Sequence, residues 1–196
     1  MNWILDGLAR IGAGLLSLLA SVGARTLFAG QASWRIVAPP FYPRVFFGQI
    51  AEFFYFSLPV VGLTALFTGM VLALQSYTGF ERFSAEAAVP QVVALSIARE
   101  LGPVLAGLMV SGRMGAAMAA ELGAMRFTEQ IDALSTLRVD PMRYLVAPRI
   151  LAATISLPLL GLAADIIGIL GGYLVAVGQL GFDGPLFIAN VMRFLT

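Results

Sequence analysis

The stretch that decides the fold is FFYFSLPVVGLTALFTGMVLALQSYTGF, residues 53–80, which contains no charged side chain in 28 positions. A helix of that length extends about 42 Å at ~1.5 Å per residue, whereas the hydrocarbon core of a bilayer is about 30 Å thick. The segment is therefore predicted to be a membrane span that tilts or protrudes from the bilayer.

The composition of the whole chain agrees with a membrane protein. Of the 196 residues, 59% are hydrophobic and 12% are charged, and the mean hydropathy is +0.89. Soluble domains carry about 25% charged residues. Two further charge-poor stretches follow the first, so three spans are predicted, at about 53–80, 88–124 and 141–181, with a kink at Gly102-Pro103 in the second. The predicted fold class is an all-α polytopic membrane helix bundle.

Several residue types are missing, which limits the chemistry of the chain. It has no Cys and no His, and all 12 basic residues are Arg. Disulfides, the usual zinc and haem ligands and Ser–His dyads are therefore excluded. A Walker A loop is excluded too, because it requires a Lys on the phosphates. We expect no catalytic residue, metal or cofactor in this chain, and any ATP must be bound by another polypeptide. The net charge of +1 gives no indication of nucleic-acid binding.

Residues 1–44 form a separate N-terminal region. Its polar side chains fall within about 100° of one another on a helix of ~3.6 residues per turn, and they are Asp6, Arg10, Ser17, Ser21 and Arg25. A narrow polar stripe on an apolar helix is typical of a helix lying in the membrane interface. The alternative is a signal peptide with its apolar region at 11–24, but the acidic Asp6 and the continuing polar stripe favour the interfacial helix.

The distribution of Arg predicts the orientation. Four Arg precede the first span and four lie at 125–149, whereas the loop at 80–88 has only Arg82. The positive-inside rule therefore places the N-terminus and the 125–149 loop in the cytoplasm, and the residues after about 181 outside.

Polar groups within the spans are candidates for a substrate cavity. In the first span, Ser57, Thr64, Thr68, Gln75 and Thr78 fall within about 80° on a helix with its ~3.6 residues per turn. These hydroxyls could bond their own backbone or join two helices. A continuous stripe that includes a Gln also suits a face turned to a cavity or to a partner helix.

The charged residues within the spans give a sharper indication. Arg99 and Glu100 lie near the expected midplane, Arg113 lies nearer the cytoplasm, and Asp165 is the only charge in the 150–180 part of the third span. A charge at that depth costs several kcal/mol and generally faces a partner or a wet cavity. Two interpretations stay open: a polar site that contacts a substrate headgroup or gates a cavity, or an ion pair of Arg99 or Arg113 with Asp165.

Small residues recur every fourth position in two spans. The second span has Gly107, Ser111, Gly115 and Ala119, and the third has Ala164, Gly168, Gly172 and Ala176. Small residues at this spacing let helix backbones approach closely, so both ladders predict helix packing within a bundle or an oligomer.

The cytoplasmic loop is predicted to contain a short helix within 126–138. Thr128 is the expected N-cap, and Glu129 and Asp132 lie in the first turns. Asp140-Pro141 is expected to begin the next helix. A capped, charged helix between two spans suits the docking of a cytoplasmic partner, while a solvated connecting helix is the simpler alternative.

Several runs of the sequence together resemble the MlaE/YrbE permease family. They are ALSIARELGPV at 94–104, SGRMG at 111–115, AELG at 120–123, TEQ at 128–130, VDP at 139–141, ISLPLL at 155–160 and GMVLALQ at 69–75. The resemblance covers about residues 45–180 in order. It implies the permease of an ABC transporter in the bacterial inner membrane that moves phospholipid or a related lipid between the inner and outer membranes.

The resemblance also implies partners and site residues. A homodimer of permeases would work with an MlaF-like ATPase, an MlaD-like periplasmic MCE protein and sometimes an MlaB-like STAS protein. Arg99 and Glu100 would face the lipid cavity, to which we add Gln75, Thr68, Arg113 and Asp165 as candidates. The coupling helix would present Arg126, Thr128, Glu129, Gln130 and Asp132 to the ATPase.

Family permeases are longer and have two further membrane helices, so the 196-residue chain is expected to be a fragment or a truncated product. Two other classes of function are alternatives. An ion-coupled secondary carrier could use Arg99, Glu100 and Asp165 as a relay, and it would need no ATPase. An intramembrane enzyme is disfavoured by the absence of His and of a GxGD motif.

Overall fold

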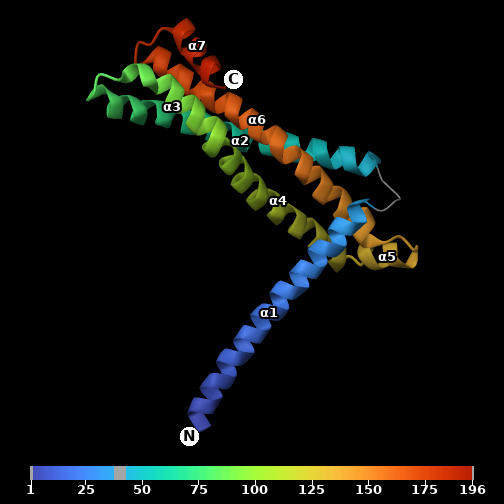
Figure 1. The fold of residues 1–196 in the computed structure, drawn as a ribbon. Helices are drawn as coiled ribbons and strands as arrows, with labels where there is room; N and C mark the ends of the chain where they lie inside the picture. The colour runs from blue at the N-terminus through green and yellow to red at the C-terminus, as the bar shows by residue number, and fades with distance from the viewer. Residues whose placement is uncertain (1, 38–42, 196) are drawn as a thin grey trace.

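The computed structural model describes residues 2–37 and 43–195, and it is helical almost throughout. Three long helical rods pack together. They are α2 (Pro43–Glu81), α6 (Ala147–Gly178), and a composite rod (Glu86–Phe127) whose last part is α4 (Gly102–Phe127). They enclose an apolar cluster that includes Phe53, Val61, Ala106, Val110 and Leu160. The predicted all-α fold is therefore confirmed (Figure 1).

Four helical segments, rather than the predicted three, are long and apolar enough to cross a membrane. They are Gly12–Trp34, Pro43–Glu81, Glu86–Phe127 and Met142–Gly178. The last three correspond to the predicted spans, although the first of these begins about ten residues before the charge-free run. The helix continues through Arg44 and Glu52 because a charged segment outside a membrane can still be helical.

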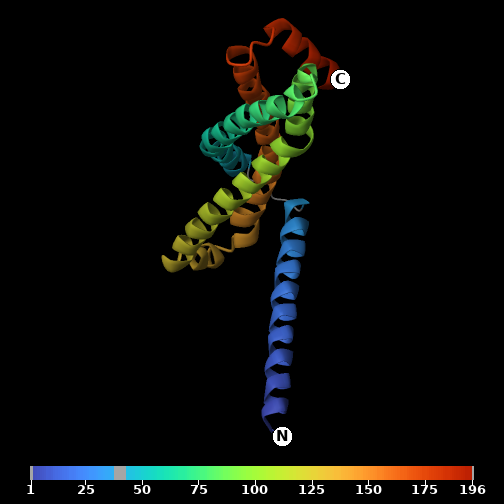
Figure 2. The same cartoon turned by 90° about the vertical axis from the view of Figure 1, so that its left-hand side faces the viewer.

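The additional segment belongs to α1 (Asn2–Val37), which projects away from the other helices in Figures 1 and 2. Only its C-terminal part touches the bundle, near η3 (Met142–Val146) and the start of α6, and Ala32 is buried there. Leu16, Leu19 and Leu27 are among its exposed apolar side chains. Length and composition permit α1 to cross a membrane, so its interfacial placement stays a prediction. The side chain of Asp6 and the connector at 38–42 lie outside the described residues.

The α2–α6 pairing is the most extensive in the fold, and it depends on glycine. A Cβ at Gly69 would collide with the carbonyl oxygen of Gly168, and one at Gly171 would collide with the carbonyl oxygen of Leu66. Ala164 and Ala176, on the same ladder as Gly168, are fully buried. The small residues of the third span therefore pack as predicted, with the two backbones in direct contact.

The small residues of the second span do not pack inside the chain. A Cβ at Gly107 or Gly115 would meet nothing within 4 Å, and Ser111 and Ala119 are exposed. Helix α4 instead contacts α2 and α6 through the neighbouring face, where Ala106, Val110 and Met114 are buried. The predicted packing through this ladder would require contact with another chain.

The second span is interrupted where a kink was predicted. It begins with η1 (Glu86–Ala88) and α3 (Val89–Ser96), continues through the π-helical turn η2 (Ile97–Leu101), and then enters α4. The amide of Gly102 donates to the carbonyl of Ile97, five residues back. Pro103 has no N–H to offer to the carbonyl of Arg99, so the regular hydrogen-bond ladder cannot continue across this point.

The short helix in the 125–149 loop differs from the prediction. Helix α5 covers only Gln130–Thr136 and has no side-chain N-cap. Glu129 adopts a left-handed φ of +58°, and the Thr128 hydroxyl donates back to the carbonyl of Ala124 at 2.9 Å, which completes the end of α4. Thr128 was therefore wrongly predicted as the N-cap. The Asp140 prediction is confirmed, because its Oδ1 accepts the amide of Met142 at 3.0 Å.

The two ends of the bundle carry different short helices (Figure 1). Helix α5 lies at one end, and α7 (Gly184–Leu195) packs on α3 at the other through Phe187 and Val191, which contact Ala94 and Ala176.

An ion pair with a buried Arg links α4, which precedes α5 in the sequence, to α6, which follows it. Arg149 is 4% exposed, and its Nη2 lies 2.5 Å from Oε1 of Glu121, whose side chain is 46% exposed. The two residues flank α5 and η3 in the sequence, so the pair links the helices that precede and follow them. It adds a polar link to the direct packing of α4 on α6.

Gly69→Leu should prevent the close approach of α2 and α6, because the backbone of Gly168 cannot move aside as a flexible side chain could. We expect a loss of about 3 kcal/mol or more, the upper range for overpacking, seen as a lower melting temperature of the purified protein in detergent. Gly79→Leu on the same helix is the control, since a Cβ there meets nothing within 4 Å. Equal stability of the two variants would contradict the account.

The Glu121–Arg149 pair predicts an asymmetry between its two removals. Glu121→Gln leaves a buried guanidinium without its counter-ion, at a cost of about 3 kcal/mol. Arg149→Met should cost less, since the remaining carboxylate is half exposed and water can solvate it. Thermal unfolding of the two variants measures the difference, and a larger loss for Arg149→Met would refute this explanation.

Candidate functional site

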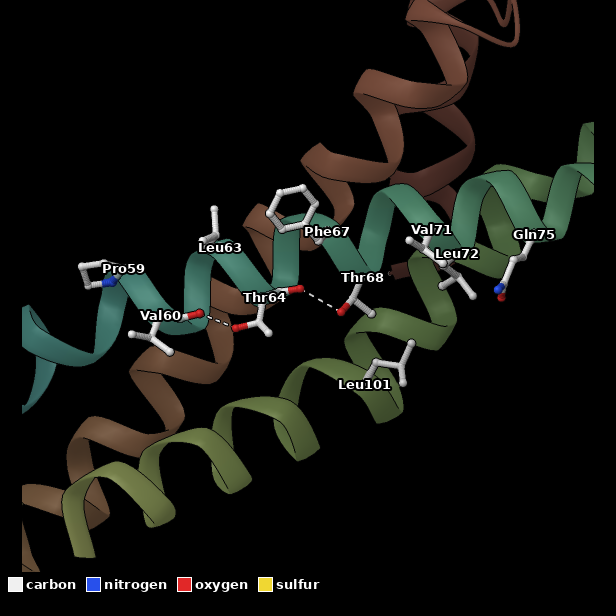
Figure 3. Close-up of a pocket in the computed structure, with 10 residues that line it drawn as sticks. All are labelled: Pro59, Val60, Leu63, Thr64, Phe67, Thr68, Val71, Leu72, Gln75 and Leu101. Carbon is white, nitrogen blue, oxygen red and sulfur yellow. Dashed lines mark hydrogen bonds between the residues drawn. The ribbon is translucent and has the colours of Figure 1, made fainter. Parts of the chain in front are cut away.

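A groove of about 810 Å³ runs along α2 opposite the π turn η2. It is lined by Pro59, Val60, Leu63, Thr64, Phe67, Thr68, Val71, Leu72, Gln75 and Leu101. Figure 3 shows the side chains of Thr64, Thr68, Leu72 and Gln75 on the side of α2 that faces Leu101. The lining is mostly apolar with a few polar groups, which is the composition of a site for a largely apolar ligand.

The polar stripe predicted on the first span divides in the structure. Thr64 and Thr68 line the groove, but each hydroxyl also donates to its own helix, Thr64 to the carbonyl of Val60 and Thr68 to that of Thr64 at 2.8 Å. Both interpretations of the stripe therefore hold for these two residues. The side-chain amide of Gln75 has no hydrogen bond within the described part of the chain, so it is available to a ligand. Ser57 and Thr78 lie outside the groove lining.

Arg99 and Glu100 both lie on η2, directly before Leu101, and both are exposed. Neither side chain forms a salt bridge or a hydrogen bond with any other described residue. They do not line the groove themselves, but the helix break that presents them also supplies Leu101 to the groove wall. The two charges therefore lie beside the groove without a counter-ion from the described chain.

Asp165 and Arg113 do not line the groove, although both were candidates for a cavity. Asp165 packs against Gly102, where a Cβ would collide with its Oδ1, and that oxygen is buried without a hydrogen-bond partner among the described residues. Arg113 instead donates from Nη1 to the Ser57 hydroxyl at 3.0 Å. Within the described residues, neither Arg99 nor Arg113 pairs with Asp165, so the predicted ion pair is wrong.

The candidate coupling residues gather at the α5 end of the bundle. Arg126 lies in the last turn of α4, and Thr128, Glu129, Gln130 and Asp132 follow it, all exposed. The apolar edge of α5 faces inward, since Ile131 and Leu134 line a small pocket with Tyr144 and Leu145. This packing leaves the polar side of α5, which carries Asp132, exposed and accessible to a partner.

Sequence reasoning missed two contacts that fix the geometry of the site. The Glu121–Arg149 pair and the Ser57–Arg113 bond join residues 28 and 56 positions apart. No local spacing connects such positions. The only signal was the presence of Arg113 and Arg149 beside charge-free runs, which suggests a partner without identifying it.

Comparison with known proteins identifies the family. The model of the family described as Permease MlaE matches residues 46–196. A "Probable ABC transporter permease protein" of Rickettsia felis is 51% identical over 185 residues, covering 94% of this chain and 71% of the relative. The "Intermembrane phospholipid transport system permease protein MlaE" of Haemophilus influenzae is 48% identical over 131 residues, which cover 67% of this chain and 50% of that protein.

A more distant relative is the "Protein TRIGALACTOSYLDIACYLGLYCEROL 1, chloroplastic" of Arabidopsis thaliana, which is 35% identical over 169 residues, covering 86% of this chain and 48% of that protein. The family match extends over all three packed rods, the groove and the α5 end. The chain therefore belongs to the MlaE permease family and is a multi-pass permease subunit of the ABC transporter class.

Proposed function

We propose that this chain is the lipid-conducting permease of an ABC transporter that moves phospholipid between the inner and outer membranes of a bacterium. The observation that carries the proposal is the groove along α2, which is open, mostly apolar and equipped with the Thr68 hydroxyl and the Gln75 amide. Such a lining suits acyl chains along its length and a polar group at its Gln75 end. The Haemophilus relative, named as an intermembrane phospholipid transport permease, supports the same substrate class.

The unpaired charges beside the groove support a polar-headed substrate. Arg99 and Glu100 lie at the break in the second span, where irregular backbone is tolerated if it lines a cavity. A headgroup with both a phosphate and an amine would match their opposite charges. Asp165 belongs to the packing behind this break rather than to the groove.

The α5 end is proposed as the ATPase-docking surface. A permease of the ABC class implies a partner ATPase, and we infer an MlaF-like subunit that binds and hydrolyses the ATP. Arg126, Thr128, Glu129, Gln130 and Asp132 are exposed there and would form the contact. The positive-inside rule supports a cytoplasmic position for this end.

Further partners are proposed from the family. A second permease could pack on the exposed small-residue face of α4, formed by Gly107, Ser111, Gly115 and Ala119. An MlaD-like MCE protein would lie on the periplasmic side, where α7 ends the described chain, and an MlaB-like STAS protein would join the ATPase. No nucleic-acid partner is proposed. The family match disfavours the ion-coupled carrier, whose relay also lacks contact between Arg99 and Asp165.

Filling the groove should block transport. Thr68→Phe places a bulky ring in the lining, and we expect transfer of a fluorescent phospholipid between proteoliposomes and acceptor vesicles to fall several-fold. Thr78→Phe is the matched control, because Thr78 lies on the same helix, bonds its own backbone in the same way and is absent from the lining. Wild-type transfer by Thr68→Phe would exclude the groove as the lipid path.

Removing the polar side chains at the start of α5 should weaken binding of the ATPase. The double variant Glu129→Ala/Gln130→Ala is expected to retain about tenfold less partner ATPase in a pull-down, which corresponds to ~1.4 kcal/mol of lost contact. Glu81→Ala/Arg82→Ala, an exposed charged pair at the opposite end of the bundle, should leave retention unchanged. If both variants retain the ATPase equally, the docking surface lies elsewhere.

A further inference from the structure

Arg113 is held in a defined position by two side chains of α2. Its Nη1 donates to the Ser57 hydroxyl at 3.0 Å, and its guanidinium carbon lies 5.6 Å from the centre of the Phe56 ring. Ser57 is only 1% exposed, so the acceptor is fixed within the α2–α4 packing. A guanidinium that is bonded on one side and stacked over an aromatic ring is preorganised, and its remaining donors point in set directions.

The positive charge of Arg113 is not neutralised by the described part of the chain. The salt bridges found there are Arg143–Asp140 and Arg149–Glu121, and neither includes Arg113. Ser57 supplies a neutral acceptor for one of the five N–H donors, and the described residues give no hydrogen-bond partner to the other four. A charge on a span is costly without a partner, so an anion from outside the described residues would stabilise it.

The depth of Arg113 matches the level of lipid headgroups. Its partner Ser57 lies five residues after Glu52, the last charge before the apolar run of α2, or about 7.5 Å along the helix at ~1.5 Å per residue. The polar interface on each side of a bilayer is about 5–8 Å thick. The guanidinium therefore lies close to the boundary between the headgroups and the acyl chains.

The position also continues the groove. Phe56, Val60, Leu63 and Phe67 recur on one face of α2 with spacings of three and four residues. Val60, Leu63 and Phe67 line the groove, and Phe56 lies one turn beyond its end, directly beneath Arg113. From Val60 to Gln75 the groove extends about 22 Å along the helix, so Arg113 stands at the opposite end from Gln75.

We propose that Arg113, held by Ser57 and Phe56, binds the phosphate of an anionic or zwitterionic phospholipid at the Pro59 end of the groove. An Arg fork contacts two phosphate oxygens at once, while the acyl chains extend along the apolar lining toward Leu101. This phosphate site is separate from Arg99 and Glu100, which lie 14 residues or about 20 Å away along the same rod. The assignment rests on the proposed lipid-conducting function.

The test compares lipid binding to the full chain purified in detergent with its ATPase and stripped of lipid. Native mass spectrometry follows titration with dioleoyl phosphatidylglycerol and with dioleoylglycerol, which has the same acyl chains but no phosphate. We expect wild type to prefer the phosphatidylglycerol by about tenfold or more, or ~1.4 kcal/mol. Arg113→Gln should abolish most of this preference, Arg113→Lys should retain part of it, and Arg82→Gln, an exposed charge outside the groove, should retain all of it.

The outcomes separate this proposal from the lipid-conducting function itself. If Arg113→Gln keeps the wild-type preference for phosphatidylglycerol, the phosphate site is refuted while the groove stands. If wild type binds neither lipid, the groove proposal fails as well. Inorganic phosphate is added as a competitor, and we expect it not to displace the lipid; displacement would mean that the site binds free phosphate. Should Arg113→Gln not fold, Arg113→Lys and Ser57→Ala are tested in its place. Full retention of the phosphatidylglycerol preference by both variants would contradict the proposal.

Discussion

The backbone contact between α2 and α6 is the constraint on which the rest of the structure depends. Lipid offers no hydrophobic drive for helices to associate, so these two rods are held by close packing at Gly69, Gly168 and Gly171. Because one face of α2 is committed to α6, a different face is left to form the groove. The composite rod then completes the groove wall only at Leu101, where the π turn interrupts the second span.

Charge within the bundle is handled in three different ways. Arg149 is buried and neutralised by Glu121, which makes it part of the fold. Asp165 is packed against Gly102 without a counter-ion in the described residues. Arg99, Glu100 and Arg113 form no salt bridge within the described residues, and none of them lines the groove. Because an unpaired charge on a span generally faces a partner or a wet cavity, these three residues are the candidates for contact with a polar-headed substrate.

Sequence reasoning succeeded where the physical signal is local. Charge-free runs located the three packed spans, Pro103 located the helix break, and Asp140 was recognised as a cap from its neighbours. It failed where tertiary register decides. Whether Arg113 meets Asp165 or Ser57 depends on how α4 rotates against α2 and α6, and the small-residue ladders of the second and third spans look alike in sequence although only the third is buried. Thr128 had two helix ends within reach, and its hydroxyl satisfied the carbonyls of the earlier one.

The central claim is that the face of α2 turned toward Leu101 carries lipid. The most direct measurement is site-specific photo-crosslinking in detergent-solubilised protein, with a photoreactive residue at Leu72 in the groove or at Ile166, an exposed apolar position on α6. Lipid retained in a groove should give phospholipid adducts at Leu72 well above those at Ile166. Equal labelling at the two positions would show that the groove holds lipid no better than the outer surface of the bundle, and would contradict the account.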